Sequence, residues 1–170
     1  LLSAGEKKEE TKNIFSSTKD TEKIILKLIG EIDTDQNFYD NAVRIFGKSF
    51  ISPLSNSGNV YYNYYLADST SLNERKIYQL HFRSKNDKNL AFNGSMQIDA
   101  ATLALVSIKA ELPSQANLNF INNLRIYQQF KIQPDNSWTL DKGNTALDIM
   151  YELLADSTQP KPRLFLSRSV

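Results

Sequence analysis

The sequence predicts a mainly β fold of the α+β class: a curved antiparallel sheet, or half-barrel, with one helix packed across its concave face. Three consecutive stretches between Lys76 and Leu112 alternate apolar and polar residues, which is typical of strands with one buried face. The polar segments KNDKN and DAAT separate these stretches and predict turns. The amphipathic segment 21–32 precedes the strands and predicts the helix.

The chain has 170 residues, which suits one domain with a sizeable core. Residues 1–20 are mostly polar and mixed in charge, so we expect a mobile lead-in before a single β-rich domain at 21–170. No apolar run approaches the roughly 20 residues of a membrane-spanning helix. The chain has no starting Met, no signal-peptide pattern, and strand-like residues at both ends. We therefore expect a piece of a longer exported protein rather than a cytosolic one.

The charge and cysteine content exclude several function classes. Lys and Arg total 20 against 19 for Asp and Glu, a net charge of +1, so no basic excess is present to bind nucleic acid. Cysteine is absent, which excludes disulfides, thiolate zinc sites and cysteine nucleophiles without deciding the compartment. No sequence feature calls for a cofactor.

The predicted helix has apolar and charged residues on opposite sides. Asp20 or Thr18 would cap its start, although the many isoleucines leave a strand as the alternative. The apolar side holds Ile24, Ile25, Leu28, Ile29 and Ile32, and the charged side holds Lys23, Lys27 and Glu31.

Strands account for most of the remaining chain. A polar loop at 33–41 leads to an apolar patch at Val43, Ile45 and Phe46, and 67–75 is expected to be a turn. The predicted strands are 59–66, 76–84, 90–98, 103–112, 123–132, one or two within 137–154, and one that begins at 163. The central strands would bury Tyr78, Leu80 and Phe82, then Phe92, Gly94, Met96 and Ile98, then Val106, Ile108, Ala110 and Leu112.

Several phrases of the sequence resemble an uncharacterised family. They are NFYDNAVRIFGKSFISPLS, YYNYYLADS, KIYQLHFRSK, LAFNGSMQIDAATLALVSIKAEL and NLNFINNLRIYQQF. Together they look like the middle domain of outer-membrane-associated proteins of Gram-negative bacteria, over about residues 37–151. The resemblance implies a carboxypeptidase-regulatory-like domain before this one, a β-barrel after it, and a location at the periplasmic face of the outer membrane.

The order and spacing of the predicted strands around FNGSMQID are also distantly similar to those of the lipoprotein-carrier (LolA/LolB-like) half-barrel fold. In that fold a helix plugs the mouth of a curled antiparallel sheet, and the segment 21–32 would supply such a helix here. By this analogy, the concave face would bind a lipid-like or apolar ligand.

Two non-enzymatic functions are expected; a third, weaker alternative is an enzyme that acts on surface glycans or peptides, for which the sequence offers no clustered acid/base pair. In the first, concave-face side chains take an acyl chain out of water at about 0.8 kcal/mol per CH₂. In the second, the domain docks against neighbouring domains of the same longer chain or other proteins, with a strand edge beside YYNYYL accepting a partner strand. The same residues would fill the space themselves in a pure scaffold. The candidate lining residues are Tyr62, Tyr64, Tyr78, Leu80, Phe82, Phe92, Met96, Val106, Ile108, Leu124, Ile126 and Trp138.

Catalytic and metal sites are not predicted. His81 is the only histidine and falls on the polar face of its strand, and no nucleophile motif accompanies it. Asp33, Asp35 and Asn37 imitate the start of a calcium loop, but Phe38 stands where glycine must turn. A capping role in the loop is the better interpretation of these three residues.

Gly94 lies inside a predicted strand, where glycine marks a bulge or a close backbone approach. In a curled sheet it would be the point at which the curvature arises.

Overall fold

The computed structural model of the chain describes residues 23, 30, 36–45, 47–113, 121–150 and 163–169. Its strands are β1 (Ala42–Ile45), β2 (Lys48–Ile51), β3 (Tyr62–Leu72), β4 (Arg75–Ser84), β5 (Asn93–Asp99), β6 (Leu105–Glu111), β7 (Ile121–Ile132), β8 (Trp138–Met150) and β9 (Arg163–Ser169), and a short helix, α2 (Gly58–Tyr61), precedes β3. Strands β3 to β9 form one antiparallel sheet in chain order, and β1 and β2 form a hairpin. The mainly antiparallel fold is therefore confirmed.

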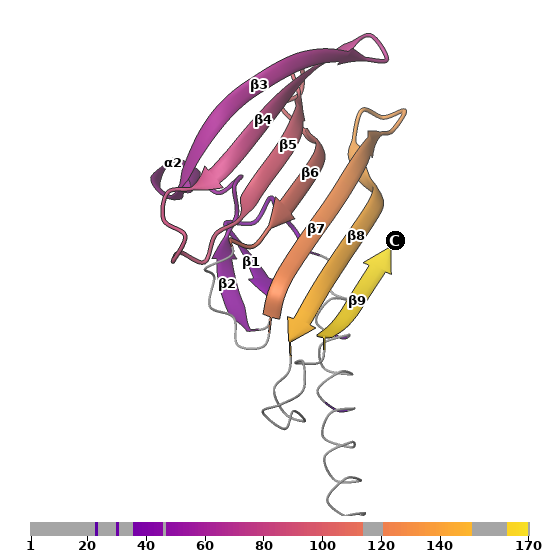
Figure 1. Ribbon diagram of the computed structural model, residues 1–170. Coiled ribbons are helices and arrows are strands. Elements are labelled where there is room, and N and C mark those ends of the chain that lie inside the picture. Colours follow the sequence, from indigo (N-terminus) through magenta and orange to yellow (C-terminus); the bar gives the residue numbers. More distant parts are fainter. Residues whose placement is uncertain are drawn as a thin grey trace, which may run out of the picture.

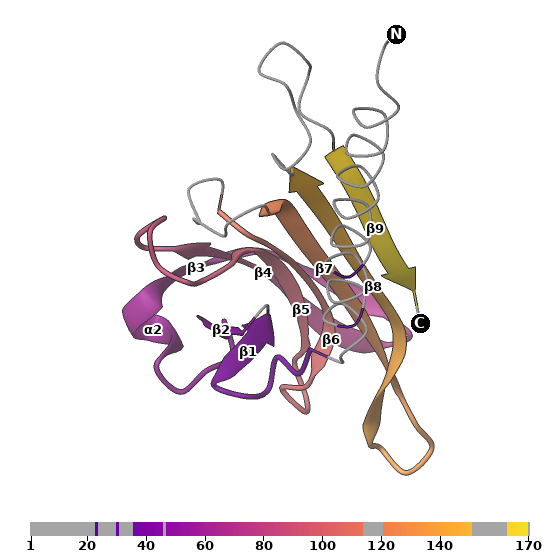
Figure 2. The ribbon, with the colours of Figure 1, turned by 90° about the horizontal axis from the view of Figure 1, so that it is seen from below.

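The seven-stranded sheet is curved and does not close into a barrel, since β3 and β9 stand at its two ends. The β1–β2 hairpin lies in the hollow of the curve (Figures 1 and 2). The helix expected at 21–32 is described only at Lys23 and Gly30, which are both helical. The expectation that this helix crosses the concave face, like the expected lead-in at 1–20, falls on residues outside the described part.

The concave face of the sheet and one side of the hairpin share an apolar core. The rings of Phe50 and Phe92 have centroids 5.3 Å apart, and Phe38 meets Phe92 edge-on at 5.7 Å. The core members are Phe38, Val43, Ile45, Phe50, Tyr62, Phe82, Ala91, Phe92, Met96, Leu105, Ile108, Ala110, Leu124, Ile126 and Leu147.

Hydrogen bonds tie the hairpin and the segments beside it to the sheet. The Tyr62 hydroxyl donates to the carbonyl of Ile51, at the end of β2, and accepts the backbone N–H of Phe92. Farther along, Gln128 Nε2 on β7 donates to the carbonyl of Gln36 at 2.6 Å. A buried polar group that loses its hydrogen-bond partner lowers the stability of the fold. These bonds therefore hold the hairpin in one position against the sheet.

Gly94 marks a close backbone approach, as the sequence predicts. A Cβ atom there would lie 1.9 Å from the carbonyl oxygen of Lys109 on β6 and 2.8 Å from the ring of Phe82. Gly94 pairs in regular register with Ala110, and the irregularity between β5 and β6 falls instead between Gln97 and Ile98. The glycine therefore serves the contact between two backbones and is not a bulge residue.

Two parts of the chain differ from the prediction. Residues 58–61 are helical, so the strand expected at 59–66 begins at Tyr62, and it runs on through the expected turn to Leu72. The actual turn is Asn73 and Glu74, both with positive φ (49° and 65°), a two-residue hairpin geometry. The pairing of β1 with β2 was not predicted, whereas 137–154 and the segment from 163 do supply strands.

Candidate functional site

Most of the candidate ligand-lining residues lie together in the core of the concave face. Val106 is buried, as expected, but the irregularity after Gln97 pairs Ile98 with Leu105 instead of Val106, and Val106 is not a member of the main core cluster. Tyr62, Phe82, Phe92, Met96, Ile108, Leu124 and Ile126 are core members, Tyr64 and Leu80 pack against them, and Val106, Tyr78 and Trp138 lie apart from this cluster.

The concave face is occupied by side chains of the chain itself. Phe38 and Phe50 lie against Phe92, and the Tyr62 ring meets Phe82 edge-on at 5.8 Å. Burial raises the pKa of the Tyr62 phenol, whose hydroxyl is held between the hairpin and the sheet. An apolar ligand at this face would have to displace part of the β1–β2 hairpin.

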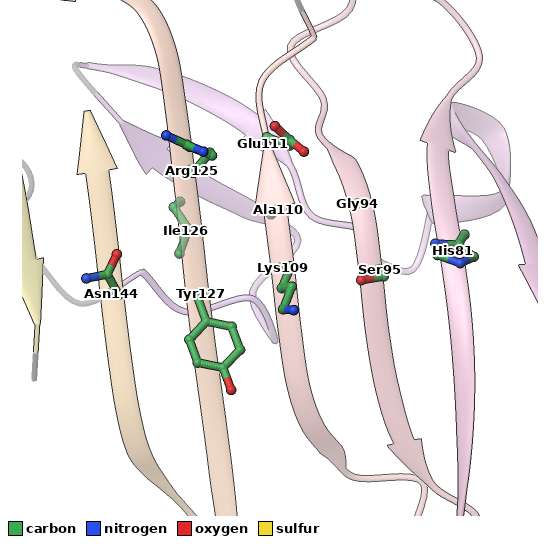
Figure 3. Close-up of a pocket in the computed structure, with 10 residues that line it drawn as sticks. All are labelled: His81, Gly94, Ser95, Lys109, Ala110, Glu111, Arg125, Ile126, Tyr127 and Asn144. Atoms are coloured by element: carbon green, nitrogen blue, oxygen red, sulfur yellow. The ribbon is translucent and has the colours of Figure 1, made fainter. Parts of the chain in front are cut away.

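The opposite, outer face of the sheet carries a hollow of about 390 Å³, lined by charged and polar side chains together with Gly94, Ala110 and Ile126 (Figure 3). The strand register explains its composition, because one row of directly paired residues crosses β4 to β8. In strand order this row is His81, Ser95, Lys109, Tyr127 and Asn144. Side chains on one row of paired residues leave the sheet on the same side. The lining residues are His81, Gly94, Ser95, Lys109, Ala110, Glu111, Arg125, Ile126, Tyr127 and Asn144.

The cations of this hollow are not neutralised by ion pairs. Among the described residues, ion pairs join Arg75 to Asp99 and Lys131 to Asp141, so Lys109 and Arg125 take part in neither. Arg125 pairs directly with Glu111 across the strands, yet their side chains point apart in Figure 3. The Lys109 ammonium lies 5.9 Å from the centre of the Tyr127 ring, a cation–π distance.

Residues 3–154 match the sequence profile described as "Family of unknown function (DUF5686)". The chain belongs to this family. The match covers most of the chain, including the hairpin and strands β3 to β8. No curated protein and no solved structure matches the chain.

In this DUF5686 chain, His81 is an exposed residue of the outer face, as its place in the strand pattern predicts. Ser95 stands directly opposite it on β5, and the structure gives no hydrogen bond between these two described residues. A serine nucleophile needs a base within hydrogen-bond reach and a third group to orient that base. His81 and Ser95 therefore form no hydrogen-bonded pair in this structure.

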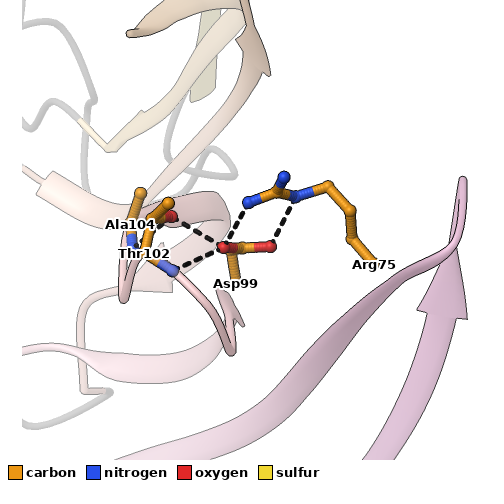
Figure 4. Close-up of polar contacts among 4 residues, drawn as sticks. All are labelled: Arg75, Asp99, Thr102 and Ala104. Carbon is orange, nitrogen blue, oxygen red and sulfur yellow. Dashed lines mark hydrogen bonds and ion pairs between the residues drawn. The ribbon is translucent and has the colours of Figure 1, made fainter. Parts of the chain in front are cut away.

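An ion pair joins Arg75 at the start of β4 to the buried carboxylate of Asp99 at the end of β5 in the DUF5686 sheet (Figure 4). Arg75 at the start of β4 donates through Nε and Nη2 to the two carboxylate oxygens of Asp99, at 2.8 and 2.7 Å. Thr102 adds its backbone N–H and its hydroxyl to the same carboxylate. The Asp99 side chain has no exposed surface, and the hydrogen bonds from Arg75, then those from Thr102, hold its pKa well below the usual range. This cluster fixes the turn between β5 and β6.

The described residues contain no group of three or more His, Asp or Glu side chains that could hold a metal ion. Asn37 accepts the backbone N–H of Tyr39 through its side chain, the capping role expected of it, whereas Asp33 and Asp35 lie outside the described residues. No helix in the described part is long and apolar enough to cross a membrane.

Sequence reasoning singled out His81 but missed the rest of the outer-face row. The alternation in the sequence does predict which residues face outward, because the polar residues at every second position of a strand lie on the same face of the sheet. What the sequence lacked was the register between strands, which decides that Lys109 stands beside Ser95 and Tyr127.

Proposed function

We propose that this chain is a non-enzymatic module at the periplasmic face of the outer membrane that docks by accepting a partner strand along the free edge of β3. The partner strand would come from a neighbouring domain of the same longer chain. The observation that carries the proposal is the exposure of β3, which pairs only with β4 among the described strands.

The character of this edge favours an interaction. From Tyr65 to Leu72 every residue of β3 is exposed. Tyr65 is 55% exposed and Leu66 is 66% exposed, so the edge strand presents one large side chain to solvent on each face of the sheet. Soluble proteins commonly protect such edges with proline, lysine or a bulge. Here β3 has no proline or lysine, and its one bulge falls between Leu66 and Asp68, so the stretch before it, from Tyr62 to Leu66, has none of these protections.

A partner strand would gain backbone hydrogen bonds along β3 and pack apolar side chains on Tyr65 and Leu66. The regular stretch before the irregularity runs from Tyr62 to Leu66, so the strongest pairing is expected there. The proposal requires no space on the concave face. It therefore agrees with a core already filled by Phe38, Phe50 and Phe92.

The test places a photo-cross-linking amino acid at Tyr65 in the full-length protein, expressed in its own cells, and maps the cross-linked peptides by mass spectrometry. The matched control carries the same group at Tyr39, which is also about half exposed (53%) but lies away from β3. We expect Tyr65, and not Tyr39, to cross-link an extended segment of a neighbouring domain with alternating apolar and polar residues. The substitution Leu66→Lys should abolish that product.

Three results would overturn the proposal: cross-links that survive Leu66→Lys, equal products from both positions, or a cross-link between two copies of this chain. Binding of a lipid-like ligand is the competing function. It predicts acyl chains in organic extracts of the purified protein and their loss when the hairpin residue Phe50 is enlarged to Trp.

A further inference from the structure

We propose that the outer-face hollow binds the phosphate group of a small phosphate ester, either free or as the headgroup of a lipid. The inference is independent of strand docking on β3, because the hollow lies on the face of the sheet across β4 to β8. Three features carry it: the charge of the lining, the neutral donors among the cations, and the size of the hollow.

The charged side chains of the lining leave a cationic excess. Lys109 and Arg125 are cations outside the ion pairs of the described residues, and Glu111 is the one carboxylate in the lining. All three are exposed at the rim of the hollow. Arg83 and Lys142 extend the exposed basic character along β4 and β8, in rows next to the lining row. The charge pattern therefore favours an anion over a neutral or cationic ligand.

Neutral hydrogen-bond donors stand among these cations. The Ser95 hydroxyl and the Asn144 side-chain amide lie in the same cross-strand row as Lys109. The amide nitrogen of Asn144 donates to Ser169 on β9 at 2.8 Å, on the side of β8 away from Lys109, so the Ser95 hydroxyl, directly opposite Lys109, is the nearer neutral donor. A guanidinium, an ammonium and neutral donors on a shared surface are the groups that bind tetrahedral oxyanions, for which arginine offers a forked pair of donors.

The size of the hollow limits the ligand. A volume of about 390 Å³ lies at the lower end of the range for small-molecule sites, enough for a phosphate with a short polar substituent. The half-buried Tyr127 ring forms one wall, and its hydroxyl donates to Gln129 at 2.7 Å, so the ring is held in place. Since the rim is exposed, a ligand can approach from solvent or from a membrane surface.

The experiment titrates the full chain with glycerol phosphate by isothermal calorimetry and NMR, and in a second arm with phosphatidylcholine vesicles with and without phosphatidylglycerol. The test variant is Lys109→Gln. Its matched control is Lys88→Gln, which removes the same charge from an exposed residue in the turn between β4 and β5. Losing one charged hydrogen bond at an open site should weaken binding by about fivefold to tenfold, and Lys88→Gln should change it little.

Each outcome decides the proposal. Binding of glycerol phosphate, with shifts at Ser95 and Asn144 and sensitivity to Lys109→Gln, supports a free ligand. Binding only to phosphatidylglycerol vesicles with the same sensitivity supports a lipid headgroup. Equal weakening by both lysine variants would show a general charge effect and overturn the site, as would no binding in either arm. Because Leu66→Lys leaves the hollow intact, failure here is separable from failure of strand docking.

Discussion

Replacing Gly94 by alanine should destabilise the fold through a collision between two backbones. The new Cβ would lie 1.9 Å from the Lys109 carbonyl oxygen, a distance that real Cβ atoms essentially never show. The obstacle on the β6 side is main chain, which cannot rotate away as a side chain can. Strands β5 and β6 would have to separate locally, at the point where Gly94 pairs with Ala110.

The magnitude follows from three contributions. Overpacking of a filled core costs about 1–3 kcal/mol. Separating the strands weakens one or two backbone hydrogen bonds at about 1 kcal/mol each. Alanine lowers the conformational entropy of the unfolded chain relative to glycine, which offsets about 0.4–1 kcal/mol of the lost stability. The net expectation is a loss of about 1–4.5 kcal/mol in the free energy of unfolding, or a fall in Tm of about 2–18 °C for a chain of this size.

The assay is urea denaturation followed by the fluorescence of Trp138, the single tryptophan. Gly30→Ala is the matched control, because Gly30 is helical and a Cβ there meets nothing within 4 Å. That control should leave the free energy of unfolding unchanged or raise it by up to about 1 kcal/mol. If Gly94→Ala unfolded at the same urea concentration as the parent chain, the close approach would not constrain the sheet and the reasoning would be wrong.

Three further predictions concern the core and the ion pair of Asp99. Tyr62→Phe should cost about 1–3 kcal/mol in urea denaturation, because it leaves the buried N–H of Phe92 and the half-buried carbonyl of Ile51 without the tyrosine hydroxyl, whereas the exposed Tyr65→Phe should cost nothing measurable. Phe50→Ala should cost about 3–5 kcal/mol by the same measurement, since this fully buried ring joins the hairpin to the sheet; a smaller loss would mean that the hairpin is dispensable. Asp99→Asn should be less stable than the parent at neutral pH. Because folding lowers the pKa of Asp99 below its ordinary value of 3.8, the stabilisation is complete above that value and is lost as the pH falls toward the folded pKa. The difference between the two proteins should therefore shrink below about pH 4, and a pH-independent difference would contradict this account.

The sequence predicted correctly the strands that have one buried face, and it predicted poorly the strand segments in which both faces are exposed. Period-two alternation located β4 to β7 because each has a buried row and a polar row. The second half of β3, from Ala67 to Leu72, is exposed on both faces, so it shows no alternation and its polar residues imitate a turn. Asn73 and Glu74 make the real turn, but Asn–Glu lacks the glycine that usually signals positive φ.

The pairing between strands was harder to predict from the sequence than the strands themselves. The hairpin that fills the concave face was missed because β1 and β2 have four residues each, too few to show a period. The contact between Arg75 and Asp99 spans 24 residues and depends on the register of β4 with β5. Neither residue type nor spacing encodes such a register, which is set by turns and by the irregularities between strands.

The core and the outer hollow depend on the same register. Side chains alternate between faces, so slipping one strand by one residue would send Lys109 into the core and Ile108 to the surface. The filled concave face, where Ile108 has no exposed surface, makes that slip costly. The packing that leaves little room for an apolar ligand therefore also holds Lys109 between Ser95 and Tyr127 on the outer face. A ligand site on that face is consequently built on rigid strands rather than on loops, which is the arrangement that keeps binding groups in place without the ligand.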